Sequence, residues 1–256
     1  MLCAFCGGGF GAETTPEGPL AKYGKMTSKT KAVRVEMDSL VTEKGIEIIR
    51  AVARMWGDAG TNRYAYRYTY ARTDGDRTST VEMGVLLTAD TAARWKIVDG
   101  EVVSASSLPK AADAKVPLYA RQIGPLAAVF DGLYGYPLLA RELLLKPELP
   151  PGHQKDGLDW FRAQKAEGGT AAFHRQFGLD YGSVWLGFSP RDGWVHSAAF
   201  VSAGGEADRM GTVSKLKRID LKPGLKGVFE LPDKVKAKLA EHERSRGARP
   251  NRAGQD

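Results

Sequence analysis

Hydrophobic and polar residues alternate in the first part of the chain before the pattern changes. In residues 32–39 (AVRVEMDS), Val33, Val35 and Met37 share one side and charged residues the other, which predicts a half-buried strand. The next run, residues 42–60 (TEKGIEIIRAVARMWGDAG), predicts a helix that ends at Gly57 or Gly60. Its apolar residues at helical spacing are Ile46, Ile49, Val52, Ala53 and Trp56.

The clearest period-two signal is RYAYRYTYAR, residues 63–72. All its tyrosines point to one side, and aromatic residues suit a pleated surface. Asp74-Gly75 makes a turn into a returning strand over residues 77–87. A further hairpin, residues 94–98 and 101–105, follows around Asp99-Gly100. An antiparallel meander is therefore predicted over residues 62–105.

After Leu108 the pattern becomes helix-like. Residues 116–152 are apolar and interrupted by Pro and Gly, and residues 155–169 (KDGLDWFRAQKAEGG) predict a short helix, so a helical insertion spans about 109–170. Strands return after Gly178. They are predicted at 181–189, 194–203 and 210–221, with a last strand at 226–232 (KGVFELP) and a helix at 235–245.

These elements predict an α+β fold. Strands on both sides of the insertion can form one strongly curved antiparallel sheet, an open half-barrel. Such a sheet must cover its apolar face, and the insertion would be its helical lid. A sheet closed by a lid encloses an apolar space, a common type of ligand site. We expect a single domain over residues 32–235.

Composition supports a folded protein with a basic end. The chain is 43% hydrophobic and 26% charged, and no apolar run is long enough to span a membrane. Of the net charge of +7, residues 234–252 carry +5, so the charge does not favour a nucleic-acid-binding body. Residues 236–256 are predicted to be a basic helix end and a mobile tail. Contact of this tail with anionic lipid or nucleic acid is the alternative.

The N-terminal residues suggest export. Residues 1–12 resemble the end of an export signal, although no positive segment precedes the apolar run, and residues 13–31 are predicted to be a polar leader. Cys3 and Cys6 form a CxxC without a second pair, and the histidines are scattered, so no metal site is predicted. A lipidated Cys6 is an alternative. The expected location is the periplasm or cell envelope.

The arrangement resembles the LolA/LolB-type superfamily of periplasmic lipoprotein carriers. The features that carry the resemblance are RYAYRYTYAR, the IVDGEVV hairpin, the apolar helical stretch and the ending Phe229-Glu230-Leu231-Pro232. The resemblance implies a half-barrel with a lid that binds acyl chains non-covalently and needs no cofactor. The implied partners are a lipid or lipid-modified protein and membrane-associated donor and acceptor proteins.

Two groups of residues are candidates for such a site. Arg63 and Arg67 are candidates for tethering the sheet to the lid. The candidates for lining the apolar cavity are aromatic or aliphatic residues of the strands and lid. For the tyrosines the alternative is a place on the outer face or packing against the first helix, and for the others it is core packing. They are Tyr64, Tyr66, Tyr68, Tyr70, Trp95, Ile97, Phe130, Leu133, Tyr134 and Leu138.

Two other classes of function remain open. A sensor or partner-binding module of the same fold would transport nothing and would have a cavity filled by its own side chains. An enzyme would need a polar cluster in that cavity, and the chain has no GxSxG elbow or HExxH motif, so we predict no catalytic residue. The residues that such a cluster could use are His174, His196, Asp180, Asp192, Ser183 and Ser197.

Overall fold

The computed structural model describes most of the chain. The described residues are 18–44, 46–61, 63–74, 76–108, 130, 135–153, 156–203 and 210–247. Residues 1–12 with Cys3 and Cys6, where the end of an export signal was expected, and the expected mobile tail from residue 248 lie outside them. In the described part, no helix has both the length and the apolar character needed to cross a membrane.

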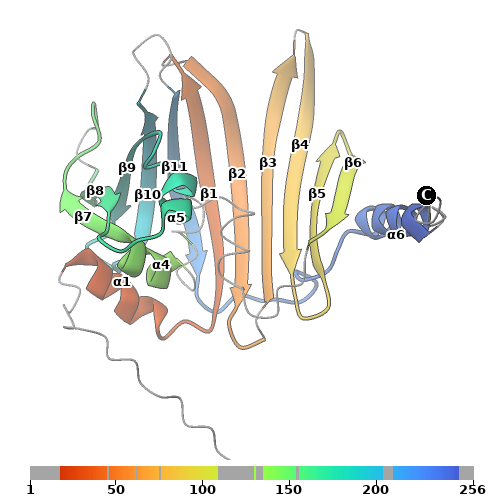
Figure 1. Ribbon diagram of the computed structural model, residues 1–256, viewed down its shortest axis with the longest axis horizontal. Coiled ribbons are helices and arrows are strands. Elements are labelled where there is room, and N and C mark those ends of the chain that lie inside the picture. The colour runs from red at the N-terminus through yellow and green to blue at the C-terminus, as the bar shows by residue number, and fades with distance from the viewer. Residues whose placement is uncertain are drawn as a thin grey trace, which may run out of the picture.

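An open antiparallel sheet of 11 strands forms the body of the molecule (Figure 1). The order is β6-β5-β4-β3-β2-β1-β11-β10-β9-β8-β7, so an N-terminal and a C-terminal meander meet where β1 pairs with β11. The predicted fold class, an open antiparallel sheet with helices, is confirmed. The strands are β1 (Ala32–Glu43), β2 (Ile46–Asp58), β3 (Arg63–Asp74), β4 (Arg77–Leu87), β5 (Ala92–Val98), β6 (Glu101–Ser107), β7 (Leu143–Pro147), β8 (Asp159–Lys165), β9 (Gly182–Phe188), β10 (Val195–Ser202) and β11 (Met210–Asp220).

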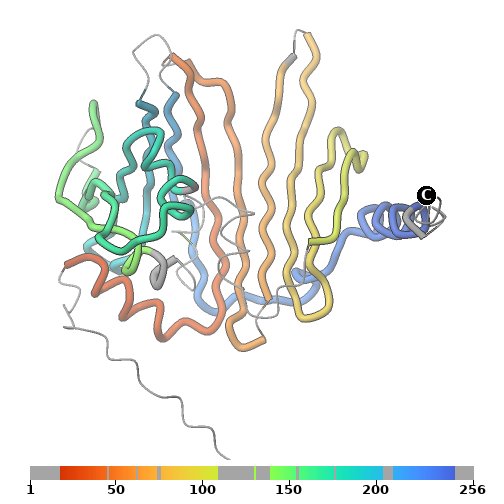
Figure 2. Tube along the Cα trace, in the orientation of Figure 1, coloured from red at the N-terminus to blue at the C-terminus, as the bar shows by residue number. Residues whose placement is uncertain are grey.

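The helices of the described residues lie at two places. α1, α4 and α5 lie beside the β7–β10 half, whereas α6 lies at the other end, beyond β6 (Figure 1). The chain trace shows the segment after β11 running along one end of the sheet to reach α6 (Figure 2). The helices are α1 (Pro19–Thr27), α4 (Gly135–Glu142), α5 (Ala171–Gln176) and α6 (Asp233–Gly247).

Each face of the sheet carries its own apolar core. We call the face that packs against α1, α4 and α5 the inner face; its cluster includes Tyr23, Met37, Tyr66 and Trp194. The opposite, outer face has a cluster on β2 to β6 that is covered by the C-terminal segment, residues 225–239. Its buried members are Trp56, Ala65, Leu86, Trp95, Ile97, Ala105 and Val235.

The helix predicted at residues 42–60 is wrong, because this segment forms the end of β1 and the long strand β2. β2 pairs with β1 on one side and β3 on the other. Its β-branched residues suit a pleated strand, and Ala51, Ala53 and Met55 alternate into the inner core. The apolar spacing fitted both periods, and tertiary pairing selected the strand.

In the described part of the insertion at 109–170, strands stand beside the predicted helices. Residues 155–169, predicted as a helix, contain strand β8, and β7 directly follows α4. In β8, Phe161 and Ala163 face the inner core, whereas Trp160 and Arg162 alternate onto the outer face. This period of two is the pattern of a strand, so the short helical interpretation was wrong.

Two further segments differ from prediction. The polar leader at 13–31 contains helix α1, which begins at Pro19 and buries Leu20 and Tyr23. Residues 226–232 form turns instead of a last strand. Their apolar side chains, including Phe229, pack on the outer cluster. By contrast, the meander at 62–105, the strands over 181–221 and the C-terminal helix form as predicted.

Candidate functional site

Strand register sorts the predicted site residues onto two faces. Tyr68 of β3 pairs with Met83 of β4, which pairs with Lys96 of β5, so these three share the inner face. Arg67 pairs with Gly84, which pairs with Trp95, so that row lies on the outer face. Directly opposed residues point to the same side of a sheet, and successive residues point to opposite sides.

Trp95 and Ile97 therefore cannot line one cavity with the tyrosines. Both are buried in the outer cluster under the C-terminal segment. The Trp95 ring lies over Gly84, where a Cβ atom would come within 2.0 Å of it, and its Nε1 donates to Glu82 at 3.2 Å. Their place is in a packed core on the far side of the sheet.

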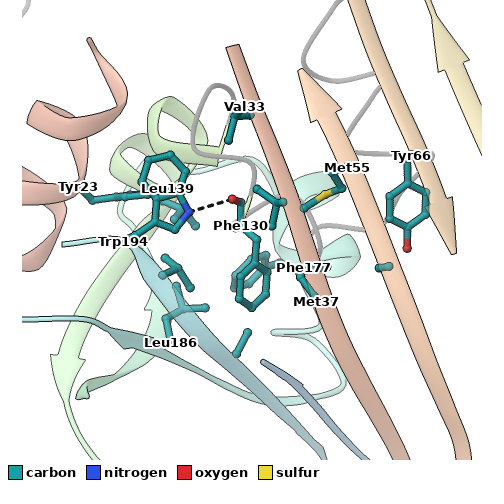
Figure 3. Close-up of a cluster of buried hydrophobic side chains, with 14 of the residues drawn as sticks. Tyr23, Val33, Met37, Met55, Tyr66, Phe130, Leu139, Phe177, Leu186 and Trp194 are labelled. Atoms are coloured by element: carbon teal, nitrogen blue, oxygen red, sulfur yellow. Dashed lines mark hydrogen bonds between the residues drawn. The ribbon is translucent and has the colours of Figure 1, made fainter. Parts of the chain in front are cut away.

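One half of the inner face, on β1, β2 and β9 to β10, is filled by side chains (Figure 3). Trp194, directly before β10, donates from Nε1 to the carbonyl of Phe130 at 3.0 Å. Its ring meets Tyr23 of α1 edge-to-face at 5.3 Å. Phe130 and Phe177 are fully buried against this half, so it is a core.

The other half of the inner face, on β3 to β5, carries the tyrosine row. Tyr64 and Tyr66 are buried, with 2% and 8% exposure, whereas Tyr68 and Tyr70 are only half-buried. Tyr66 stacks on Tyr68 with ring centroids 6.4 Å apart, and Tyr68 lies 5.6 Å from Tyr70. Beside them Met83 is 38% exposed. This half presents an aromatic and thioether surface that is partly open.

The environment of the row is apolar enough to affect ionisation. Burial raises the pKa of Tyr66 well above its usual range, with a smaller contribution from the neighbouring Tyr68. Burial also raises the pKa of Tyr68, with Tyr70 adding to it. These phenols stay neutral at physiological pH, so the surface offers rings and hydroxyls without charge.

The helices beside the inner face are tied together at Glu142, the last residue of α4. Its buried carboxylate accepts from the Thr170 backbone N–H at 2.5 Å and from Arg141 Nε at 2.7 Å. Its carbonyl bonds to His174 Nε2 of α5 at 2.8 Å. Burial alone would raise the pKa of Glu142, but the hydrogen bonds from Thr170 and Arg141 outweigh it and lower the pKa.

Of the predicted lid residues, the structure places Phe130 in the inner core. Leu138 belongs to α4. Leu133 and Tyr134 lie outside the described residues.

The arginines expected to tether the lid contact other groups. Arg63 pairs with Asp58 at 3.0 Å, and its guanidinium lies 4.6 Å from the ring centre of Phe229 in the C-terminal segment. Arg67 lies 5.9 Å from the Trp56 ring. Both act on the outer face, away from the helices that cover the inner one.

The residues considered for catalysis have separate structural roles. His196 Nε2 lies 2.9 Å from Asp192, at the turn before β10. Ser197 donates to the Ser214 carbonyl, and Ser183 accepts from Arg162. Asp180 pairs with Lys165. These contacts bring no serine hydroxyl to His196, and the described residues contain no group of three or more potential metal ligands.

Three inner-face residues were missed by sequence reasoning: Met83, Arg94 and Lys96. The alternation that marks β5 as a strand also puts Arg94 and Lys96 opposite to Trp95 and Ile97. The turns of the meander set the strand register, and the register decides which alternate residues of β5 share a face with the tyrosines. The signal was therefore present, but it needed the register across three strands.

Comparison with known proteins gives structural neighbours only. No family model matches the chain, and no curated protein matches it significantly by sequence. Among solved structures, MucB aligns with a TM-score of 0.32 and 9% identity over 84% of this chain and 62% of its own. A DUF1329 family protein from Desulfovibrio piger gives 0.35 and 11% identity, covering 83% of this chain and 95% of that one.

A LolA superfamily protein from Nitrosomonas europaea aligns with a TM-score of 0.32 and 13% identity, over 85% of this chain and 94% of its own. This chain spans less than two thirds of MucB.

Proposed function

We propose that this protein is a carrier that binds the acyl chain of a lipid or lipid-modified polypeptide on the open half of its inner face. The observation that carries the proposal is the unequal filling of that face. Tyr68, Tyr70 and Met83 stay partly exposed beside an otherwise packed apolar core. An acyl chain laid along them would remove this apolar surface from water.

The energetics suit reversible binding. Each methylene moved out of water contributes about 0.8 kcal/mol. Association itself costs several kcal/mol, which offsets part of this gain. A long chain can therefore be held by non-covalent contacts alone, and its release needs no covalent step. The uncharged tyrosine rings add apolar contact area. They bring no buried charge, which would be unfavourable because an acyl chain has no group to pair with it.

The carrier role extends this binding to transport. We propose that the protein works in the periplasm or cell envelope, receives its lipid from a membrane-associated donor and passes it to an acceptor. Release would then need a conformational change, and we propose that the helices joined through Glu142, Thr170 and His174 take part in it.

A neutral photoreactive probe tests the binding step. The full chain is incubated with a long-chain monoacylglycerol that carries a diazirine, irradiated and mapped by peptide mass spectrometry. We expect labels on β3 and β4, and we expect Tyr68→Asp to reduce labelling at least fivefold. Thr69→Asp is the matched control, because Thr69 neighbours Tyr68 on the same strand but points to the outer face.

Either of two results would overturn the proposal. One is the absence of labelling in a folded protein. The other is labelling that Tyr68→Asp and Thr69→Asp reduce equally. A folded protein without labelling would support the partner-binding module instead.

A further inference from the structure

Two cations lie on the inner face beside the tyrosine row. Arg94 pairs in register with Val85, which pairs with Tyr66, and Lys96 pairs with Met83, which pairs with Tyr68. Arg94 is exposed and Lys96 is half-buried. They therefore stand on β5, at the rim of the apolar surface and toward the sheet edge formed by β6.

One carboxylate of β6 shares this face: Glu101 pairs in register with Val98 and is exposed. The inner-face positions of Tyr64–Arg72, Ser79–Leu87 and Ala92–Val98 hold no carboxylate, because Glu82 belongs to the outer row. Among the described residues, neither Arg94 nor Lys96 forms an ion pair.

Two cations on the outer face, by contrast, have an ion-pair partner. Arg54 Nε bonds to Glu36 at 3.0 Å, and Lys217 Nζ lies 3.7 Å from the same carboxylate. These two cations have an ion-pair partner within the protein. Arg94 and Lys96 differ from them in having apolar neighbours and no ion-pair partner among the described residues.

Hydroxyl groups complete the rim. Arg94 donates from Nε to Ser106 Oγ at 3.1 Å, which orients its guanidinium along β6. Lys96 pairs in register with Ser104, an exposed residue of the same strand. Neighbouring strands lie about 4.8 Å apart, so Lys96 is roughly 10 Å from Tyr68 across the sheet. The apolar surface around Tyr68 and the cations and serines of β5 and β6 are therefore separate parts of one face.

We propose that the ligand is an acidic amphiphile. Its acyl chain lies on Tyr68, Tyr70 and Met83, and its anionic headgroup, a phosphate or a carboxylate, binds Arg94 and Lys96. A guanidinium oriented by a serine suits a phosphate or carboxylate, and an ammonium adds a second charge. This inference rests on the proposed function, because it names the class of lipid that the same face would hold.

The test compares three probes with the same alkyl chain: a monoacylglycerol, a fatty acid and a lysophosphatidic acid. Binding to the full chain is measured below the critical micelle concentration by competition with the neutral photoprobe. We expect one or both acidic probes to bind about five- to tenfold more tightly than the neutral one. The preference should shrink as ionic strength rises.

Charge-neutral variants identify the groups responsible. Arg94→Gln with Lys96→Gln should remove the preference for the acidic probes over the neutral one. Lys215→Gln with Arg218→Gln is the matched control, since it removes the same charge from exposed residues of β11. Inorganic phosphate alone at millimolar concentration should not displace the probes, because the chain supplies most of the affinity.

The outcomes separate this inference from the proposed function. Equal binding of all three probes would overturn the acidic preference and leave the carrier proposal standing. A preference that both double variants lose equally would assign it to overall charge and would also overturn the inference. No binding of any probe would overturn both. A preference for only one acidic probe would decide between phosphate and carboxylate headgroups.

Discussion

The two halves of the inner face contain similar aromatic residues but bury them to different degrees. On the β1 and β9 to β10 side, Trp194, Phe130 and Phe177 are buried against one another and against the helices. On the β3 to β5 side, Tyr68, Tyr70 and Met83 remain partly exposed. Aromatic content therefore does not distinguish core from candidate site in this protein. The presence of covering side chains does, and in the described part of the chain α1, α4 and α5 all lie on one half.

The largest expected effect is a loss of stability when the filled half of the inner face, on the β1 and β9 to β10 side, loses a core side chain. Trp194→Ala should lower the free energy of unfolding by about 3–5 kcal/mol, because it leaves a cavity and removes the hydrogen bond to Phe130. Urea denaturation followed by circular dichroism measures this loss. Tyr70→Ala in the open half is the comparison and should cost less than half as much; equal losses would mean that the two halves are packed alike.

A second change tests the separation of the two faces. Gly84→Ala puts a methyl group where the Trp95 ring lies, so it should destabilise the protein by roughly 1–3 kcal/mol. The folded fraction should still bind the neutral probe with unchanged affinity, because the strain falls on the outer face. Reduced affinity in well-folded Gly84→Ala protein would contradict this separation.

The anchor of the helices gives a pH-dependent effect. The pKa of Glu142 is lowered from its ordinary value of 4.5, so its carboxylate stabilises the folded state above that pH. This stability is lost as pH falls through the lower, folded-state pKa. Glu142→Gln should therefore cost roughly 1–3 kcal/mol at pH 7 and progressively less below pH 4.5. Denaturation at a series of pH values tests this, and a pH-independent difference would contradict it.

The smallest effect on stability should accompany a clear effect on binding. Met83→Ser replaces a side chain that is already 38% exposed, so it should change stability by less than about 1 kcal/mol. It removes apolar contact area, so neutral-probe affinity should fall severalfold. Val103→Ser, at an exposed position on edge strand β6, serves as the control and should leave affinity unchanged.

Sequence reasoning found the fold class because its strongest signals were local. The tyrosine alternation and the Asp99-Gly100 turn each specify their own hairpin, and both appear in the structure. β2 was missed because Ile49, Val52 and Trp56 fit helical spacing as well as a strand. Only its pairing with β1 and β3 decides between them.

The candidate site was predicted only in part, for a related reason. Periodicity assigns residues of one strand to two sides but does not say which sides coincide on neighbouring strands. Trp95 and Ile97 were grouped with the tyrosines on apolar character alone, although register places Arg94 and Lys96 there. The contact of Arg63 with Phe229 could not be predicted, because the path of the C-terminal segment depends on the whole fold.

The central pairing of the sheet also bears on how the chain acquires its structure. Partners in β1 and β11 are between 167 and 186 residues apart in the sequence. Contacts between such distant segments form slowly, since a long loop must close first. During synthesis, the edge of β1 in the N-terminal meander therefore stays unpaired until β11 has been made. An unpaired strand edge is a template for aggregation, so a chaperone that shields β1 until β11 emerges would raise the yield of folded protein.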